Sequence, residues 1–162
     1  MKPDIKVIKA DYLDNTQAAD IARLLNAYAS DPMGGGKALP AEIQATLCQE
    51  LAKLPHAFSM IAYVDGKAAG LANCFEVFST FACKPIINIH DVVVLESFRG
   101  RGIGRMLLES IEAHARTRGC CKLTLEVLSG NRVAAGLYNR FGFNRYELDP
   151  AMGSAEFWQK PL

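Results

Sequence analysis

The chain has 162 residues, 50% of them hydrophobic and 22% charged, which suits a single domain over residues 1–162 and excludes a fully disordered chain. Its 18 Lys and Arg residues against 17 Asp and Glu leave a net charge of +1, less basic than proteins held on nucleic acid by its phosphates. No apolar run approaches the roughly 20 residues that span a bilayer, and the charged first residues do not resemble a signal peptide. We therefore expect a cytoplasmic protein with neither a nucleic-acid nor a membrane partner.

The first 95 residues predict one strand, two helices and three strands, in that order. A loop with three consecutive glycines separates the two helices, and Asp65-Gly66 is a strong hairpin signal between the next two strands. Pro85 is expected to break the chain before the last of these strands. The predicted ranges are Ile5–Ala10, Asp14–Ala29, Pro40–Lys53, Phe58–Val64, Lys67–Phe78 and Ile86–Leu95.

The rest of the chain predicts a glycine-rich connection, then helices alternating with short strands. Gly119 and Gly142 are placed to end the two helices. The predicted ranges are Arg105–Arg118, Leu123–Val127, Asn131–Phe141, Asn144–Leu148 and Glu156–Lys160. This order indicates an α/β fold of the mixed α+β kind, with a mixed sheet and helices packed on it.

Metal and disulfide sites are not expected. The five cysteines are odd in number, irregularly spaced and without a C-x-x-C pair, and the three histidines stand at no ligand spacing from them. Free cysteines usually behave as small buried apolar residues.

The segment from Glu96 to Arg105 predicts an anion site. Here a buried strand runs into a loop with three glycines that opens a helix, and three arginines surround it. Backbone N–H groups at such a junction lack partners, and the helix dipole adds positive potential, so a phosphate or pyrophosphate is the natural occupant. No Gly-Lys-Ser/Thr follows, which argues against a nucleoside-triphosphate loop. Arg105 stands where a dinucleotide fingerprint needs its third glycine.

Three ordered motifs resemble the GCN5-related N-acetyltransferases (the GNAT family). Arg99-Gly100-Arg101-Gly102-Ile103-Gly104 is similar to the family's R/Q-x-x-G-x-G/A motif. Downstream, the segments 125–131 and 134–143 resemble its L-E-V-x-x-x-N and A-x-x-L-Y-x-x-x-G-F segments. The resemblance covers about residues 87–146.

The resemblance implies a largely antiparallel central sheet, flanked by helices and splayed between two parallel strands, with acetyl-CoA in the gap. The main chain of Val92, Val93 and Val94 would hold the pantetheine, and Asn131 would meet the cofactor arm. The pyrophosphate would lie on the amides of the glycine loop, which comprises Arg99, Gly100, Arg101, Gly102, Ile103, Gly104 and Arg105.

The expected chemistry is direct attack of an amine on the thioester in a ternary complex. Tyr138, in the family's position for the acid, would protonate the departing thiolate. Glu126 is the expected base, through a water, although an ion pair with a nearby Arg would explain it equally well. His90 and Asp91 are the rival pair, and both could line one face only if a bulge intervenes. Asp31 and Glu76 are further candidates to receive a cationic substrate.

We therefore expect an enzyme that transfers acetyl from acetyl-CoA to the primary amine of a small molecule. The alternatives are acetylation of a protein N-terminal or lysine amine, since Leu125–Tyr138 resembles the ribosomal-protein alanine acetyltransferases, and a non-catalytic CoA-binding module. Phe75, Phe78 and Phe81 could serve a homodimer surface as readily as a pocket.

Overall fold

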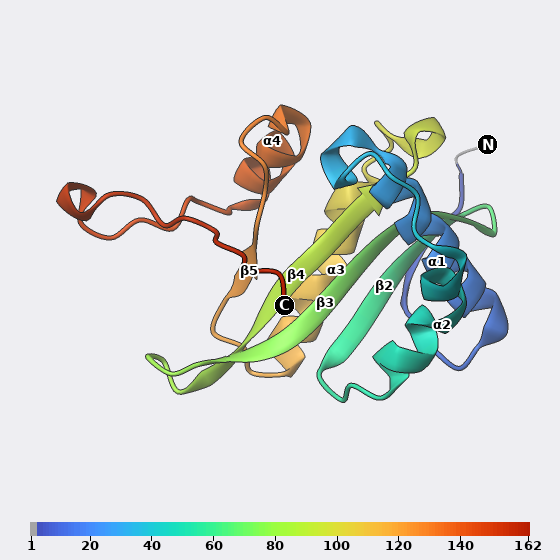
Figure 1. Ribbon diagram of the computed structural model, residues 1–162, viewed down its shortest axis with the longest axis horizontal. Coiled ribbons are helices and arrows are strands. Elements are labelled where there is room, and N and C mark those ends of the chain that lie inside the picture. The colour runs from blue at the N-terminus through green and yellow to red at the C-terminus, as the bar shows by residue number, and fades with distance from the viewer. Residues whose placement is uncertain (1–2) are drawn as a thin grey trace.

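A computed structural model describes residues 3–162 and has one twisted sheet between helices (Figure 1). The five strands lie in chain order, each antiparallel to the one before except β5, which is parallel to β4. The strands are β1 (Ile5–Lys9), β2 (Ala57–Val64), β3 (Lys67–Ser79), β4 (Lys84–Val94) and β5 (Leu123–Leu125). The helices are α1 (Asn15–Ser30), α2 (Ala41–Ala52), α3 (Ile103–Thr117) and α4 (Arg132–Phe141), with 3-10 turns at Pro32–Gly34, Glu96–Phe98 and Pro150–Met152. This arrangement confirms the predicted fold class.

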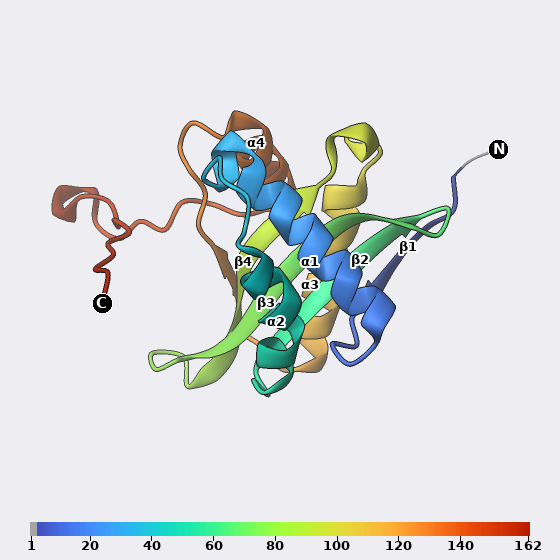
Figure 2. The same ribbon diagram turned by 45° about the vertical axis from the view of Figure 1, so that its right-hand side comes forward.

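The core lies in two layers, one on each face of the sheet. On one face α3 packs its buried stripe of Ile103, Leu107, Leu108 and Ile111 against the strands. On the other, which we call the front face, α1 and α2 cover β2 and β3 around Ile61 and Leu71. Figure 2 shows α1 and α2 on the near side of the sheet and α3 behind it.

Local sequence signals predict element boundaries correctly where a helix cap or a tight turn sets the boundary. Asp14 accepts the Gln17 N–H at 2.9 Å and begins α1. Asp65 and Gly66 both have positive φ and join β2 to β3 as the hairpin signal predicted.

Proline did not end the pairing where we expected it to. Pro85 lies inside β4, opposite Phe78, as the second residue of the strand and beside the turn that closes the β3–β4 hairpin, and proline is tolerated at the start of a strand. Its carbonyl accepts the Cys121 N–H at 2.9 Å.

The two strands predicted at Asn144–Leu148 and Glu156–Lys160 are not formed. Beyond Phe143 the chain has one isolated bridge, between Glu147 and Ser154, and the turn Pro150–Met152. A strand needs a neighbour for its backbone hydrogen bonds, and Figure 2 shows this part of the chain extending away from the body instead.

Across residues 3–162, every helix is too short or too polar to cross a bilayer.

Candidate functional site

A large cavity opens where β4 and β5 separate. The parallel pairing joins only Ile87–Ile89 to Leu123–Leu125, and β4 then continues to Val94 without a neighbour on that side. The cavity has a volume of about 880 Å³ and lies between the end of β4, the glycine loop, α1 and α4. All the residues predicted to hold a cofactor line it except Arg101; they are Val92, Val93, Val94, Arg99, Gly100, Gly102, Ile103, Gly104, Arg105 and Asn131. We call this cavity the cleft.

The start of α3 presents free backbone donors to the cleft. The first hydrogen bond of the helix runs from Met106 N–H to the Gly102 carbonyl, 3.1 Å, so the amides of the three residues between them have no intrahelical partner. Gly102 has φ +80° and no side chain closing the helix end. At Gly104 a Cβ would lie 2.9 Å from Leu137, so glycine allows α4 to pack close. These amides and the helix dipole suit an anion.

The arginines of the loop are partly engaged already. Arg99 donates Nε–H to the Val94 carbonyl at 3.1 Å, and its Nη2 lies 3.4 Å from Asp31 Oδ2. Arg101 turns back over the Phe98 ring and onto the Ser97 carbonyl, which takes its side chain out of the cleft lining. Asp31 therefore ties the α1–α2 connection to the glycine loop, an ion pair that weakens its case as a receptor for a cationic substrate.

Tyr138 lies in the cleft, on α4. Its side chain is 9% exposed, and the hydroxyl finds no hydrogen-bond partner within residues 3–162. Burial, with the nearby Tyr28, raises the pKa of Tyr138 to about 12. Its phenol therefore stays protonated at neutral pH and can act as a donor.

Tyr28 is a cleft residue that the sequence analysis did not single out. It lines the cavity from the last turn of α1, and its pKa is raised by burial and by Asp91 and Asp31. In the sequence, Tyr28 fits the apolar spacing of its helix, and this spacing by itself accounts for it as a core residue. Its position next to the triple-glycine loop was the only sequence signal.

Asn131 has a structural task as well as a place in the cleft. Its side chain accepts the Ala134 N–H at 3.1 Å and begins α4. The cap fixes the start of the helix that carries Tyr138.

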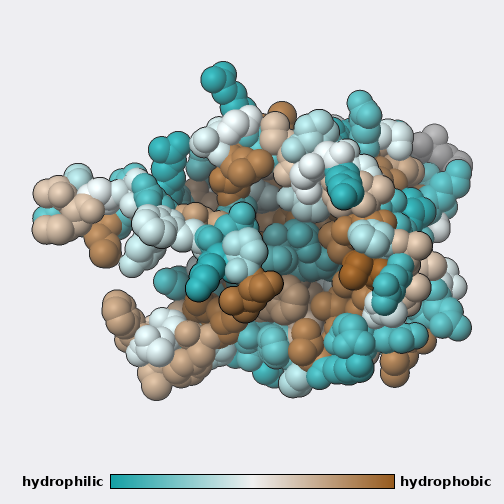
Figure 3. All heavy atoms as spheres, viewed as in Figure 1, coloured by the Kyte–Doolittle hydropathy of each residue, from teal (hydrophilic) through white to brown (hydrophobic). Residues whose placement is uncertain are grey.

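Glu126 lies outside the cleft lining, on the front face just beyond β5. Asn88 donates Nδ2–H to both of its carboxylate oxygens at 3.3 Å and to Thr124 at 3.3 Å. Glu126 has no ion pair among the described residues. It is exposed, as a base acting through a water would be. Figure 3 shows this face hollowed over the middle of the sheet, with hydrophilic side chains gathered there.

A bulge in β4 brings His90 and Asp91, the other candidates for the base, to the same region of the sheet as Glu126. Asn73 pairs with Asp91 and Cys74 with Ile89, so His90 is the extra residue of β4. His90 meets the Phe75 ring edge-on at 5.6 Å. Asp91 accepts from Asn73 at 3.0 Å, Asn73 accepts from Ser59 at 2.7 Å, and Ser59 bonds the Tyr12 hydroxyl at 2.9 Å. Both His90 and Asp91 therefore remain candidates for the base.

Glu76 is engaged elsewhere. Arg118 holds its carboxylate through Nε at 2.9 Å and Nη2 at 3.2 Å. Within residues 3–162, no group of three or more His, Cys, Asp or Glu side chains could hold a metal ion.

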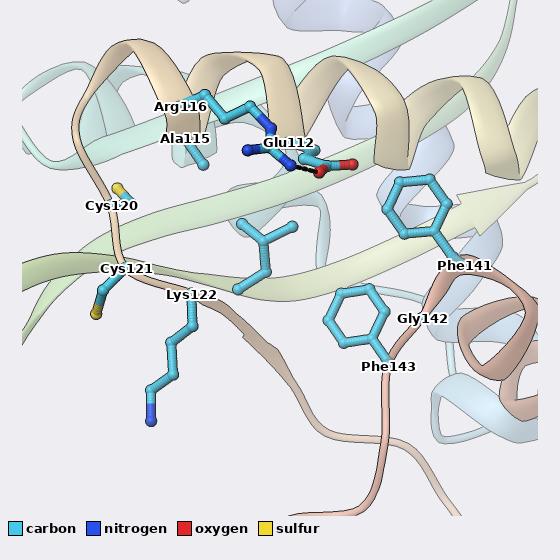
Figure 4. A pocket seen from close by; sticks show the side chains of 10 residues that line it. Glu112, Ala115, Arg116, Cys120, Cys121, Lys122, Phe141, Gly142 and Phe143 are labelled. Carbon is cyan, nitrogen blue, oxygen red and sulfur yellow. Dashed lines mark hydrogen bonds and ion pairs between the residues drawn. The ribbon is translucent and has the colours of Figure 1, made fainter.

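A second, smaller hollow of about 300 Å³ lies on the α3 face beside β5 (Figure 4). Figure 4 shows the rings of Phe141 and Phe143 on one side of it and Cys120, Cys121 and Lys122 on the other. It is separate from the cleft, with which it shares no lining residue.

Known proteins resemble the chain in sequence and in structure. The model of the acetyltransferase (GNAT) family matches residues 21–143. The streptothricin acetyltransferase of Streptomyces lavendulae is 39% identical over 88 residues, 54% of this chain and 44% of its own length. The [ribosomal protein bS18]-alanine N-acetyltransferase of Salmonella typhimurium is 43% identical over 56 residues, 35% of this chain and 38% of its own length. The chain thus spans less than half the length of either relative.

Among solved structures, an aminoglycoside N-acetyltransferase in complex with CoA superposes with a TM-score of 0.76. The match covers 100% of this chain and 98% of that one, at 19% sequence identity. At this identity the likeness concerns the fold.

Proposed function

The chain belongs to the acetyltransferase (GNAT) family, and from this premise we propose that it transfers the acetyl group of acetyl-CoA to the primary amine of a small molecule. The observation that carries the proposal is the separation of β4 from β5 beyond Ile89 and Leu125, which leaves the free edge of Val92–Val94 in line with the unpaired amides of α3. An extended arm can pair with such an edge while its anionic end meets the helix start.

The cofactor fits this cleft in both size and chemistry. A ligand cavity usually measures about 300–1,000 Å³, and the cleft has about 880 Å³. The diphosphate would meet the amides of Ile103, Gly104 and Arg105, and the pantetheine would follow the edge of β4 toward Tyr138. No metal is required, since positioned donors can stabilise the developing charges.

Acetyl transfer would proceed by direct attack. A primary amine has a pKa near 10 and arrives protonated, so a base must take its proton. Glu126 could do so through a water at the open end of the cleft, and His90 or Asp91 could do so from the bulge of β4. The choice is tested by pH–rate profiles of Glu126→Gln, His90→Gln and Asp91→Asn, because loss of the base should remove the acidic limb of the profile.

Tyr138 would serve the leaving group. With its pKa near 12, its phenol is a weaker acid than an ordinary thiol of pKa about 8.5. Full proton transfer to the thiolate would be uphill, so we assign Tyr138 to hydrogen-bond donation as negative charge develops on sulfur.

The small-amine acceptor is supported by the streptothricin and aminoglycoside acetyltransferases among the similar proteins. A peptide amine is the second candidate, supported by the match to the bS18-alanine enzyme. We place the protein in the cytoplasm, as its five free cysteines favour; cell fractionation would check this.

The test is CoA release from acetyl-CoA in the presence of amino sugars, polyamines, amino acids and peptides with an N-terminal alanine. We expect release with at least one small amine and none with its N-acetylated form, which is the matched control. Release with peptides alone would favour the second candidate. Binding of acetyl-CoA without release from any acceptor would leave only a CoA-binding module.

A further inference from the structure

A row of polar side chains crosses the front face of the sheet. Ser59 on β2 stands opposite Asn73 on β3, and Asn73 stands opposite Asp91 on β4. We call these three residues the polar row. The adjacent row on the same face is apolar and consists of Ile61, Leu71 and Val93. Ser59 and Asn73 are only 0% and 4% exposed, and burying polar groups costs free energy unless they are hydrogen-bonded.

The hydrogen bonds of the polar row all run toward Asp91. An ionised carboxylate has no proton to donate, so the Asn73 amide is the donor, from Nδ2 to Asp91 Oδ2 at 3.0 Å. The Asn73 carbonyl oxygen then accepts from the Ser59 hydroxyl at 2.7 Å. That bond uses the one hydrogen of Ser59, so the Tyr12 hydroxyl is the donor in its 2.9 Å bond to Ser59. Burial raises the pKa of Tyr12 to about 12, and its hydroxyl therefore keeps this proton at neutral pH.

Asp91 has one carboxylate oxygen left for a ligand. Its Oδ2 accepts from Asn73, and its Oδ1 has no hydrogen-bond partner within residues 3–162. Asp91 is half-buried and forms no ion pair in the described part of the chain. Hydrogen bonds between a cation and a carboxylate are among the strong ones, so a cationic donor is the ligand that suits this oxygen.

Asp91 also lies at the end of the cleft where the acetyl group is expected. The amides proposed to hold the diphosphate follow Val94, so the thioester would lie at the other end of the free edge, toward Val92. Asp91 is the next residue in that direction. Burial raises the pKa of Tyr28 and the negative charge of Asp91 raises it further, so this carboxylate is close enough to act on a residue of the cleft lining.

We propose that Asp91 binds the ammonium group of the acceptor, and that Asn73 is a positioning residue that holds the Asp91 carboxylate in place. Ser59 and Tyr12 support Asn73 from behind. The inference rests on the acetyl transfer proposed above and narrows its acceptor to amines that arrive as cations. Binding precedes the loss of the amine proton, and the base that takes this proton is identified separately by the pH–rate profiles.

Asn73 contributes by fixing which oxygen of Asp91 faces the acceptor. The second side-chain torsion of an aspartate has broad minima, so a free carboxylate could turn in its plane. The bond from Asn73 removes this freedom, and the bond from Ser59 keeps the Asn73 amide from turning over. A group that is already oriented loses less entropy when the ligand binds.

The test is calorimetric titration of the CoA-loaded protein with spermidine, glucosamine and lysine. We expect at least one of these amines to bind. Asp91→Asn, which keeps the shape and removes the charge, should raise the Kd of that amine about tenfold or more, the usual worth of a hydrogen bond to a charged group. Asn73→Ala should raise it about three- to tenfold. Neither variant should change the Kd of CoA.

A double variant separates positioning from a purely structural role. If Asn73 acts through Asp91, Asn73→Ala adds no further loss once Asp91→Asn is present, whereas independent structural damage would multiply the two losses. Ser59→Ala removes the support of Asn73 with little change in volume, and it should also weaken amine binding if Asn73→Ala does not fold. Tyr63→Phe is the matched control, because it deletes a hydroxyl bonded to Asp20 at 3.0 Å in the same layer but away from the polar row. It should leave amine binding unchanged.

Three results would count against the inference. An unchanged amine Kd in Asp91→Asn would overturn it, and so would the absence of binding by all three amines. Multiplied losses in the double variant would overturn the role of Asn73. Amine binding that depends on Asp91, without CoA release from acetyl-CoA, would uphold this site and count against acetyl transfer, so the two proposals fail separately.

Discussion

At the scale of single residues, the site depends on what each side chain already contacts. Tyr138 has no hydrogen-bond partner among residues 3–162 and lines the cleft, whereas Asn131 caps α4 and Asp31 pairs with Arg99. A polar group without a partner in a half-closed cavity is the most readily available to a ligand.

Tyr138→Phe should lower kcat by about 10²–10³-fold, the usual cost of removing one positioned hydrogen-bond donor, and spare the affinity for acetyl-CoA. Since burial raises the pKa of Tyr138 to about 12, the wild-type rate should not fall through ionisation of this phenol below about pH 11. Steady-state kinetics from pH 6 to pH 10 would measure both the change in kcat and the pH dependence of the wild-type rate.

Tyr63→Phe is the control for that experiment. Tyr63 donates to Asp20 at 3.0 Å and also has a pKa raised to about 12, but it lies outside the cleft lining. It should keep full activity. An unchanged kcat in Tyr138→Phe would remove Tyr138 from the mechanism.

At the scale of elements, the anion site belongs to the junction of β4 and α3 as a whole. The strand ends at Val94, a 3-10 turn follows, and two left-handed glycines, Gly100 and Gly102, turn the chain into the helix. The amides are free because a helix cannot pair its first donors, so their role depends on geometry and not on one side chain.

Gly102→Asp should reduce the affinity for CoA at least tenfold, which is about 1.4 kcal/mol, because it places a carboxylate where we expect phosphate. The measurement is a thermal-shift titration, in which a ligand at 100 times its Kd stabilises the folded protein by about 2.7 kcal/mol.

Gly102→Asn separates charge from backbone strain. Asn and Asp have nearly the same shape and both tolerate a positive φ better than other residues, and no atom lies within 4 Å of a Cβ at this position. Asn should therefore bind CoA within a few-fold of the wild type. Equal loss in both variants would trace the effect to the backbone or to the added side chain and not to charge, and wild-type affinity in Gly102→Asp would place the phosphate elsewhere.

At the scale of the whole molecule, the sheet is held to its helices by apolar layers, and few charged groups join distant parts. One that does is the pair of Glu76 on β3 and Arg118, which follows α3. The hydrogen bond from Arg118 lowers the pKa of Glu76. A carboxylate whose pKa is lower in the folded state stabilises it above the unfolded pKa of about 4.3 and loses this effect as the pH falls further.

Glu76→Gln should therefore melt below the wild type at pH 7, and the difference should shrink as the pH falls below about 4.3. Melting curves across this range would show it. Glu147→Gln, which lies beyond Phe143 and outside any ion pair of the described chain, should show no such pH-dependent difference. A constant difference for Glu76→Gln at every pH would mean that Arg118 does not act through the charge of Glu76.

Much of the fold was predictable because local signals determine it. Asp14, the Asp65-Gly66 turn, Asn131 and Gly142 each mark an element boundary through the conformation of their own backbone and neighbours. α3 begins at Ile103, two residues earlier than expected, and β5 ends at Leu125, two residues earlier than the predicted strand. These ends depend on partners that a local pattern does not contain.

By itself, the sequence determined the order of the elements, the glycine loop that opens a helix, and the family resemblance carried by three motifs. These are local properties, because turns, caps and apolar periodicity act over a few residues. Tertiary structure decided where β4 and β5 part, which of Asp31, Glu76 and Glu126 is already paired, and that Tyr28 joins the cleft. It also decided that the last two predicted strands lack a neighbour within the chain, because a strand forms only where another backbone satisfies its hydrogen bonds.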